Sequence, residues 1–145
     1  MAYSGKFFPK NPKKYRGDVN NIWYRSLWER KAMDWFDSNA SVLEWSSEEL
    51  IIPYISPLDN KYHRYFPDFV AQVKTRDGDL KRYVIEVKPE KQTKPPEKAK
   101  RVTKRIINEI ATWGVNEAKW KAATDFCSDR GWIFKIITEK ELNIK

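Results

Sequence analysis

The sequence predicts a single α/β domain in which helices flank a mixed β-sheet. Apolar and polar residues alternate on both sides of residues 76–78, which predicts a β-hairpin between about residues 68 and 88. Apolar residues at helical spacing precede and follow this hairpin, and a strongly β-prone segment at 132–137 comes after the last helical stretch. We expect that segment to return to the sheet beside the strand that carries Glu86, through a helical crossover.

Composition limits the possible functions. The chain has 145 residues, of which 41% are hydrophobic, so residues 1–145 are sufficient for one domain with one core. A formal net charge of +8 indicates a polyanionic partner, with nucleic acid as the first candidate and a merely solvated basic surface as the alternative. One cysteine and one histidine exclude a disulfide framework and a Cys/His zinc site built from this chain alone. The sequence also has no run of apolar residues long enough for a membrane span, so we expect no membrane partner.

The first 20 residues are polar and basic and lack apolar periodicity, which indicates an N-terminal arm at about residues 1–20. Lys and Arg side chains in such an arm can clamp DNA phosphates. An ordinary solvated arm is an equally good interpretation. The candidate DNA-binding residues in and after this arm are Lys10, Lys13, Lys14, Arg16 and Arg25.

A helix is expected at 26–37, with Ser26 as its N-cap. Ser26 and Glu29 have the spacing of a capping box, and this role alone would explain Glu29. A catalytic Glu29 becomes the better interpretation only if other acids converge on it. Strands are expected at 41–46 and 50–55, and Pro53 places the second of them at a sheet edge or a bulge.

The register of the hairpin follows from its turn. If residues 76–78 form a three-residue loop with Gly78 in the left-handed region, Thr75 faces Asp79 and Asp68 faces Glu86. One face of the hairpin is then apolar, and the other carries Asp68, Glu86 and Lys88 at one end. A two-residue turn would move Glu86 to the face opposite Asp68 and would mix polar residues into the apolar face.

Two carboxylates at opposed strand positions offer hard oxygen ligands for Mg²⁺, for which Mn²⁺ can substitute. Lys88 lies two residues beyond Glu86 and therefore on the same face, where it can orient a water molecule or stabilise negative charge on a phosphate. A surface Glu/Lys ladder is the plain alternative for Glu86 and Lys88 taken alone. The addition of Pro67-Asp68 makes the pattern more specific.

Beyond the hairpin we expect a basic, proline-bearing loop, one helix at 97–113, a second helix from Asn116 to Gly131, and a final helical turn at 138–142. Basic residues crowd the loop and the start of the first of these helices, where a bound polyanion or simple solvation would explain them. These candidate DNA-binding residues are Lys91, Lys94, Lys98, Arg101, Lys104 and Arg105.

The order of the acidic residues resembles a known family. Glu29 in a helix, Pro67-Asp68 at the start of a strand, and Glu86-Val87-Lys88 at the end of the next strand are similar to the motif of the PD-(D/E)XK nucleases. This resemblance implies a restriction-endonuclease-like mixed sheet flanked by helices, Mg²⁺ held by Asp68, Glu86 and Glu29, and hydrolysis of DNA phosphodiester bonds. It also raises Glu29 from a capping residue to an expected site residue, since a carboxylate can serve both purposes.

A narrower resemblance covers most of the chain. It is carried by residues 3–6, 9–11, 14–18, 24–26, 52–54, 64–66 and 116–123, which look like the head completion nucleases of T-even-type phages, in the TnsA-like endonuclease group. The resemblance implies a phage protein that processes packaged double-stranded DNA ends before tail joining. It would contact head or portal proteins, first in the host cytoplasm and then in the virion.

The sequence is also compatible with other functions. A structural DNA-end or portal-binding protein could retain the nuclease fold without cutting DNA. Junction-resolving and transposition endonucleases share the catalytic motif, although less of their sequence is visible here. A dimer is compatible with an edge strand in so small a domain, but nothing in the sequence requires one.

Overall fold

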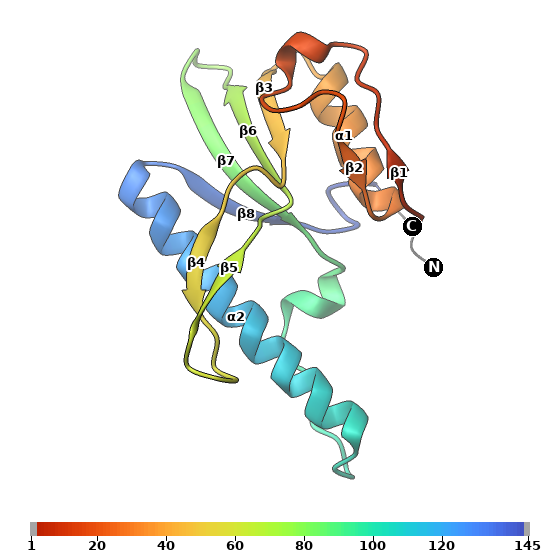
Figure 1. Ribbon diagram of the computed structural model, residues 1–145, viewed down its shortest axis with the longest axis vertical. Helices are drawn as coiled ribbons and strands as arrows, with labels where there is room; N and C mark the ends of the chain where they lie inside the picture. Colours follow the sequence, from red (N-terminus) through yellow and green to blue (C-terminus); the bar gives the residue numbers. More distant parts are fainter. Residues whose placement is uncertain (1–2, 144–145) are drawn as a thin grey trace.

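A four-stranded mixed sheet forms the centre of the molecule, in the order β3–β6–β7–β8 (Figure 1). The structure is a computed structural model that describes residues 3–143. Strands β3 (Val42–Ser47), β6 (Phe69–Lys74) and β7 (Leu80–Val87) pair antiparallel, and β8 (Ile133–Ile137) lies parallel to β7. The expected mixed sheet and the expected place of the last strand, beside the one that carries Glu86, are therefore confirmed.

The turn between β6 and β7 sets the register of the site. The Thr75 amide donates to the Asp79 carbonyl at 2.8 Å, and the Gly78 amide donates to the Thr75 carbonyl at 3.0 Å. Gly78 has a φ of 86°, a left-handed conformation that favours glycine. The pairing runs back to Phe69 opposite Ile85, so the next position places Asp68 opposite Glu86. The three-residue turn is confirmed.

The two faces of this sheet support separate hydrophobic clusters. Phe69 and Ile85 pack on one face against Trp45 and against α1 (Leu27–Ser38). Val70, Val84 and residues of α2 (Lys104–Arg130) pack on the opposite face. Because successive strand residues point to opposite faces, Glu86 lies on the face that α2 covers.

The segment expected as a basic arm is packed against the domain. Strands β1 (Gly5–Lys6) and β2 (Trp23–Tyr24) pair, and the intervening chain includes the short 3-10 helix η1 (Pro12–Lys14). Phe7 and Tyr15 are only 7% and 5% exposed, and both rings meet the Trp45 ring edge-on. The segment is therefore part of the core that covers the α1 face of the sheet. The sequence did not predict this, because these contacts follow no regular spacing.

One long helix replaces the two that were expected between residues 97 and 131. α2 runs unbroken from Lys104 to Arg130, and the Thr103 side chain caps it by accepting a hydrogen bond from the Ile106 amide at 3.2 Å. Asn116, expected as an N-cap, is buried within the helix. Its local capping tendency is overridden because the buried face of α2 continues beyond it through Trp120 and Ala123. Residues 97–103 belong to the preceding loop.

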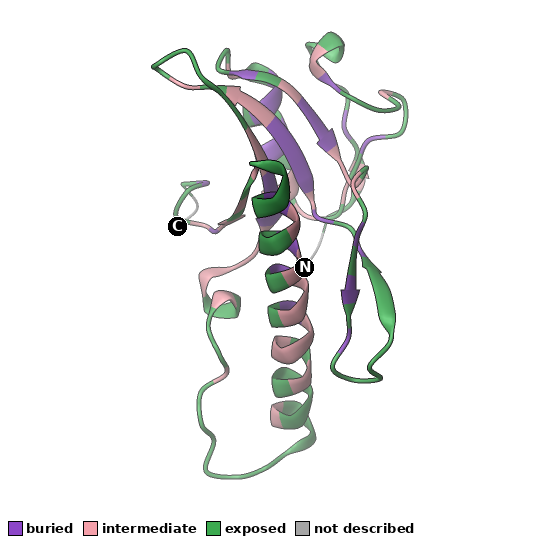
Figure 2. Cartoon of the chain, turned by 90° about the vertical axis from the view of Figure 1, so that its left-hand side faces the viewer, coloured by how far each residue is buried: buried purple, intermediate pink, exposed green. Residues whose placement is uncertain are grey.

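Strands β4 (Ile52–Ile55) and β5 (Tyr62–Tyr65) form a separate two-stranded sheet that extends along α2 (Figure 1). Its inner face places Tyr54 and Tyr65 in the α2 cluster. Among the described residues, β4 pairs with β5 alone, which agrees with the edge position predicted from Pro53. The half of α2 nearer its N-terminus and the loop before it are largely exposed (Figure 2).

A turn follows β8, where a final helical turn was expected at 138–142. In this turn the Leu142 amide donates to the Thr138 carbonyl at 3.2 Å. Leu142 is buried in the α1-side cluster. Within residues 3–143, no helix combines the length and the apolar composition that crossing a membrane requires.

Candidate active site

A cleft of about 430 Å³ opens where the β4–β5 hairpin leaves the main sheet. It lies between the start of β6, the end of β7 and the side of α2. The cleft is lined by Arg25, Glu48, Arg64, Tyr65, Phe66, Asp68, Glu86 and Lys119. Two of the predicted site acids therefore share a single hollow with several cationic side chains.

Asp68 stands at the entrance to β6, held in place by the strand beside it. Its Oδ2 atom accepts a hydrogen bond from the Val87 amide at 2.8 Å. Burial and the facing Glu86 carboxylate raise the pKa of Asp68 to about 8, although the Val87 amide acts in the opposite direction. Without a bound cation, burial and the repulsion between the two carboxylates therefore favour retention of a proton on Asp68 near neutral pH.

Glu86 is the more deeply buried acid, with 6% of its surface exposed. Burial raises its pKa, and the nearby Lys88 ammonium opposes this shift. The Lys88 Nζ atom lies 4.0 Å from Glu86 Oε2, the limit of an ion pair. Lys88 therefore stands beside the acids, as predicted, and compensates only part of their charge.

Glu29 is both a capping residue of α1 and an acid near Asp68, the two interpretations that the sequence left open. Its own amide donates to Ser26 Oγ at 3.2 Å, and its Oε1 atom accepts from the Arg25 amide at 3.4 Å. The capping box is thus present, although the carboxylate reaches the amide of Arg25 and not that of the N-cap residue Ser26. Burial raises the pKa of Glu29, and the charge of Asp68 raises it further. Glu29 therefore lies close enough to interact with Asp68 electrostatically, but it does not line the cleft.

The donor set fits a divalent cation at Asp68 and Glu86. Two facing carboxylates with raised pKa values are the arrangement that a bound cation relieves, and hard oxygen donors suit Mg²⁺. The Tyr65 hydroxyl is buried beside the Glu86 carboxylate and has no hydrogen-bond partner of good geometry among the described residues. Within residues 3–143, no cluster of three or more acidic, histidine or cysteine side chains has the geometry of a metal site, so Glu29 is not drawn together with the pair.

Five cleft residues were not identified from the sequence as site residues, namely Glu48, Arg64, Tyr65, Phe66 and Lys119. Lys119 reaches the cleft from α2, Tyr65 comes from the end of β5, and Glu48 follows β3. Glu48 has a φ of 54°, unusual for a residue with a side chain, and forms an ion pair with Arg25 at 3.0 Å. Lys119 lies three residues after the buried Asn116 and four before the buried Ala123, a helical spacing that places it on the buried side of α2.

The candidate DNA-binding residues of the N-terminal segment divide into two groups. Lys10 and Lys13 are exposed, and Arg25 is an exposed residue at the cleft. Arg16 instead pairs with Glu44, with 2.6 Å between its Nε and Oε2. The Lys14 ammonium donates to the carbonyls of Phe36, Asp37 and Asn39 at 2.7, 2.9 and 2.9 Å, at the C-terminus of α1. We infer that Lys14 serves stability.

This inference gives a prediction with a matched control. Lys14→Met should lower the free energy of unfolding by about 1–3 kcal/mol, because it leaves helix-terminal carbonyls without their charged donor. Lys13→Met, which changes an exposed neighbour, should leave the stability within about 0.5 kcal/mol. Urea unfolding monitored by circular dichroism measures both. Equal stabilities of the two variants would show that the Lys14 contacts contribute nothing.

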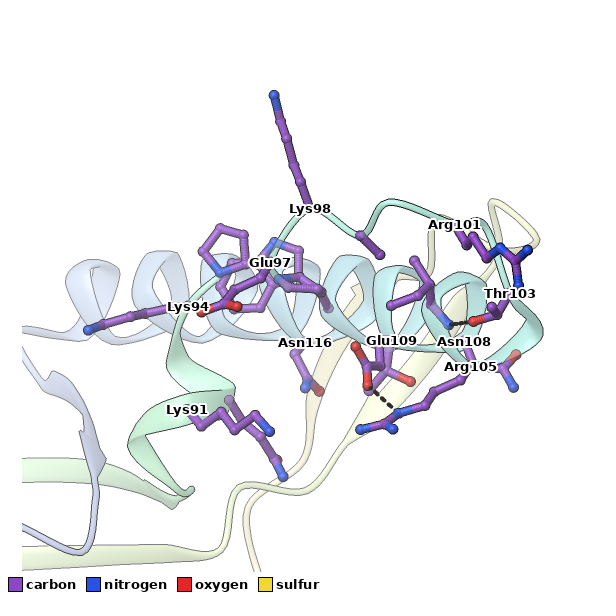
Figure 3. A pocket seen from close by; sticks show the side chains of 17 residues that line it. Lys91, Lys94, Glu97, Lys98, Arg101, Thr103, Arg105, Asn108, Glu109 and Asn116 are labelled. Atoms are coloured by element: carbon purple, nitrogen blue, oxygen red, sulfur yellow. Dashed lines mark hydrogen bonds and ion pairs between the residues drawn. The ribbon is translucent and has the colours of Figure 1, made fainter.

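Most of the candidate DNA-binding residues after β7 surround a hollow of about 1390 Å³, which lies between the loop after β7 and the first half of α2 (Figure 3). Lys91, Lys94, Lys98, Arg101 and Arg105 line it, and Lys104 is exposed at the start of α2. Arg105 pairs with Glu109 at 3.2 Å, and Lys98 extends away from the helix into solvent (Figure 3). These residues form a basic border beyond Lys88, separate from the acidic cleft.

Comparison with known proteins places the chain in a family. The model for the TnsA-like endonuclease N-terminal family matches residues 39–139, a span that includes Asp68, Glu86, Lys88 and Lys119 but not Glu29. The head completion nuclease of Enterobacteria phage T4 is 45% identical to this chain over 146 residues, covering 98% of the chain and 95% of the relative. A search of solved structures finds no significant match. The chain therefore belongs to the TnsA-like endonuclease N-terminal family.

Proposed function

We propose that this protein is a metal-dependent deoxyribonuclease that completes phage heads by processing packaged DNA ends before tail joining. The facing pair of Asp68 and Glu86, with Lys88 beside it, carries the proposal. Membership of an endonuclease family and the similarity to a head completion nuclease support it. The mixed sheet with a helix on each face is consistent with a restriction-endonuclease-like fold.

Each residue of the site has a distinct role in this proposal. Asp68 and Glu86 would hold Mg²⁺, for which Mn²⁺ can substitute. Such an ion acts as a Lewis acid that polarises a phosphoryl oxygen and makes a water molecule more acidic. Lys88 orients the attacking water or stabilises the charge that develops on the phosphate. Glu29 keeps Arg25 and the start of α1 in place and adds negative charge beside Asp68.

Double-stranded DNA is the substrate that the charge distribution favours. The chain carries a net charge of +8, although its cleft contains the buried acids. Arg25 and Arg64 line the cleft, and the exposed basic residues beyond Lys88 extend the positive surface. A duplex backbone lying along these residues would release counterions, so binding should weaken steeply as salt rises.

A cleavage assay with metal controls tests this function. We expect the wild-type protein to cut supercoiled and linear DNA with Mg²⁺ or Mn²⁺ and to be inactive in EDTA. Asp68→Ala should lose cation binding and Lys88→Ala should lose transition-state stabilisation, so each should reduce the cleavage rate by about 10²-fold or more. Lys81→Ala is the control, because Lys81 is exposed on β7, and this variant should cut normally.

The same assay distinguishes a nuclease from a structural head protein that does not cut DNA. If the wild type cuts no better than Asp68→Ala with either metal, the protein is not a nuclease. A non-cutting protein that still binds DNA ends or head proteins and still restores head completion would be the structural protein considered from the sequence. Selective cutting of branched DNA over linear ends would favour a junction-resolving activity instead.

A further inference from the structure

Lys119 is a second lysine of the site, on a different element from Lys88. It projects from α2 into the cleft that contains Asp68 and Glu86. The next residue, Trp120, and Ala123 are buried against the sheet and fix this part of the helix. The base of the Lys119 side chain is therefore held at a defined position relative to both acids.

Two aromatic rings hold the other end of the side chain. The Lys119 Nζ atom lies 5.6 Å from the centroid of the Tyr65 ring and 5.8 Å from that of the Tyr54 ring. These rings come from adjacent strands of the β4–β5 hairpin, and each attracts the ammonium by a cation–π interaction. Such contacts restrict a flexible side chain before any ligand binds, so less conformational entropy is lost on binding.

The charge of Lys119 has no carboxylate partner among residues 3–143. The ion pairs of this part of the chain leave it out, whereas Lys88 lies 4.0 Å from Glu86. Lys119 lines the same cleft as Asp68 and Glu86, and its positive charge opposes the rise in the Glu86 pKa that burial causes. A fixed cation with unused hydrogen-bond donors, facing a cleft, is suited to an anionic ligand.

We propose that the Lys119 ammonium binds a non-bridging oxygen of the scissile phosphate, which makes Lys119 a further catalytic residue. This inference rests on the proposed nuclease function and assigns a role to a residue outside the Glu-x-Lys motif. Lys88 and Lys119 then approach the site from different parts of the fold, Lys88 from the residue after β7 and Lys119 from α2. Negative charge grows on the phosphate oxygens as the reaction proceeds, so a fixed ammonium binds the transition state more tightly than the substrate.

Lys119 transfers no atom in this reaction. The oxygen of water forms the new bond to phosphorus, and the leaving oxygen departs with the electrons of the broken P–O bond. The water proton is released to solvent, and the leaving oxygen takes up a proton from solvent. Lys119 remains an ammonium throughout and contributes only charge and hydrogen bonds.

The test compares three variants with the wild type by steady-state cleavage of a labelled DNA duplex in Mg²⁺. Lys119→Met should lower kcat by about 10²-fold while KM changes by less than about 3-fold, because the lost interaction strengthens in the transition state. Lys119→Arg keeps the charge with altered geometry and should recover about 10-fold of that loss. Lys121→Met changes an exposed lysine of the same helix and should cut like the wild type.

Folding and the proposed function are checked in the same experiment. Circular dichroism should show Lys119→Met folded, and duplex binding measured by fluorescence anisotropy in EDTA should be within about 3-fold of the wild type. A normal kcat for Lys119→Met would overturn the role of Lys119, and so would equal losses of kcat in Lys119→Met and Lys119→Arg. In either case the nuclease proposal would stand as long as the wild type cuts DNA faster than Asp68→Ala. Wild-type activity no higher than that of Asp68→Ala would overturn both.

Discussion

Asp68→Asn is expected to abolish DNA cleavage and, at pH 8, to raise the melting temperature of the metal-free protein by about 5 °C. Burial and the facing Glu86 carboxylate raise the pKa of Asp68 from 3.8 to about 8. The folded protein therefore binds this proton more tightly than the unfolded chain does. Its stabilising effect is complete below about pH 4 and is lost as the pH rises through about 8. An asparagine carries no charge at any of these pH values and can still accept the Val87 hydrogen bond.

The pH dependence distinguishes this effect from a general gain in stability. Wild type and Asp68→Asn should melt at nearly the same temperature at pH 4, and the difference should grow toward pH 8. Mg²⁺ should raise the melting temperature of the wild type and have little effect on the variant, because a ligand stabilises only the state that binds it. Calorimetry of both proteins at pH 4 and pH 8, in EDTA and in Mg²⁺, gives these melting temperatures. A lower melting temperature for Asp68→Asn at pH 8 would mean that the wild-type carboxylate is already well compensated.

Phe7→Ala is expected to lower the free energy of unfolding by about 3 kcal/mol. The Phe7 ring is 7% exposed, and its centroid lies 5.8 Å from that of Trp45 in an edge-on arrangement. The substitution opens a cavity next to the largest fully buried side chain of the core. A loss of this size is a substantial part of the roughly 5–15 kcal/mol that stabilises a typical domain. Urea unfolding, followed by circular dichroism, measures it as a lower midpoint at an unchanged slope.

Phe8→Ala provides the matched control. Phe8 is the next residue along the chain and is 77% exposed, so its loss should change stability by less than about 0.5 kcal/mol. The pair therefore tests whether the N-terminal segment is part of the core. If both substitutions were neutral, the segment would be the loosely attached arm that the sequence suggested, and any contribution from it would be confined to DNA binding.

The hairpin register could be predicted because short-range rules determine it. Alternating polarity fixes which side chains share a face, and Gly78 fixes the length of the turn. The convergence of Asp68 and Glu86 follows from those two facts alone. Lys88 follows as well, since it lies two residues beyond Glu86, directly after the end of β7.

Other features depend on contacts that local patterns do not encode. Asn116 has the chemistry of a helix cap, but the tertiary contacts of its neighbours keep it inside α2. Phe7 and Tyr15 join the core through Trp45, a residue far along the chain. Lys119 reaches the cleft only because the β4–β5 hairpin docks on α2. Helical spacing places Lys119 on the buried side of α2, but it does not show that this side faces the two acids.

The arrangement of the cleft also affects when activity can first arise during synthesis. Both acids lie on the sheet face that α2 covers, and α2 and β8 follow them in the chain. A nascent chain that has emerged only as far as β7 contains Asp68 and Glu86 but neither the helix that buries them nor the strand that pairs with Glu86. The cleft can therefore be complete only after α2 and β8 have emerged from the ribosome. Products truncated before α2 would carry both acids without the complete cleft.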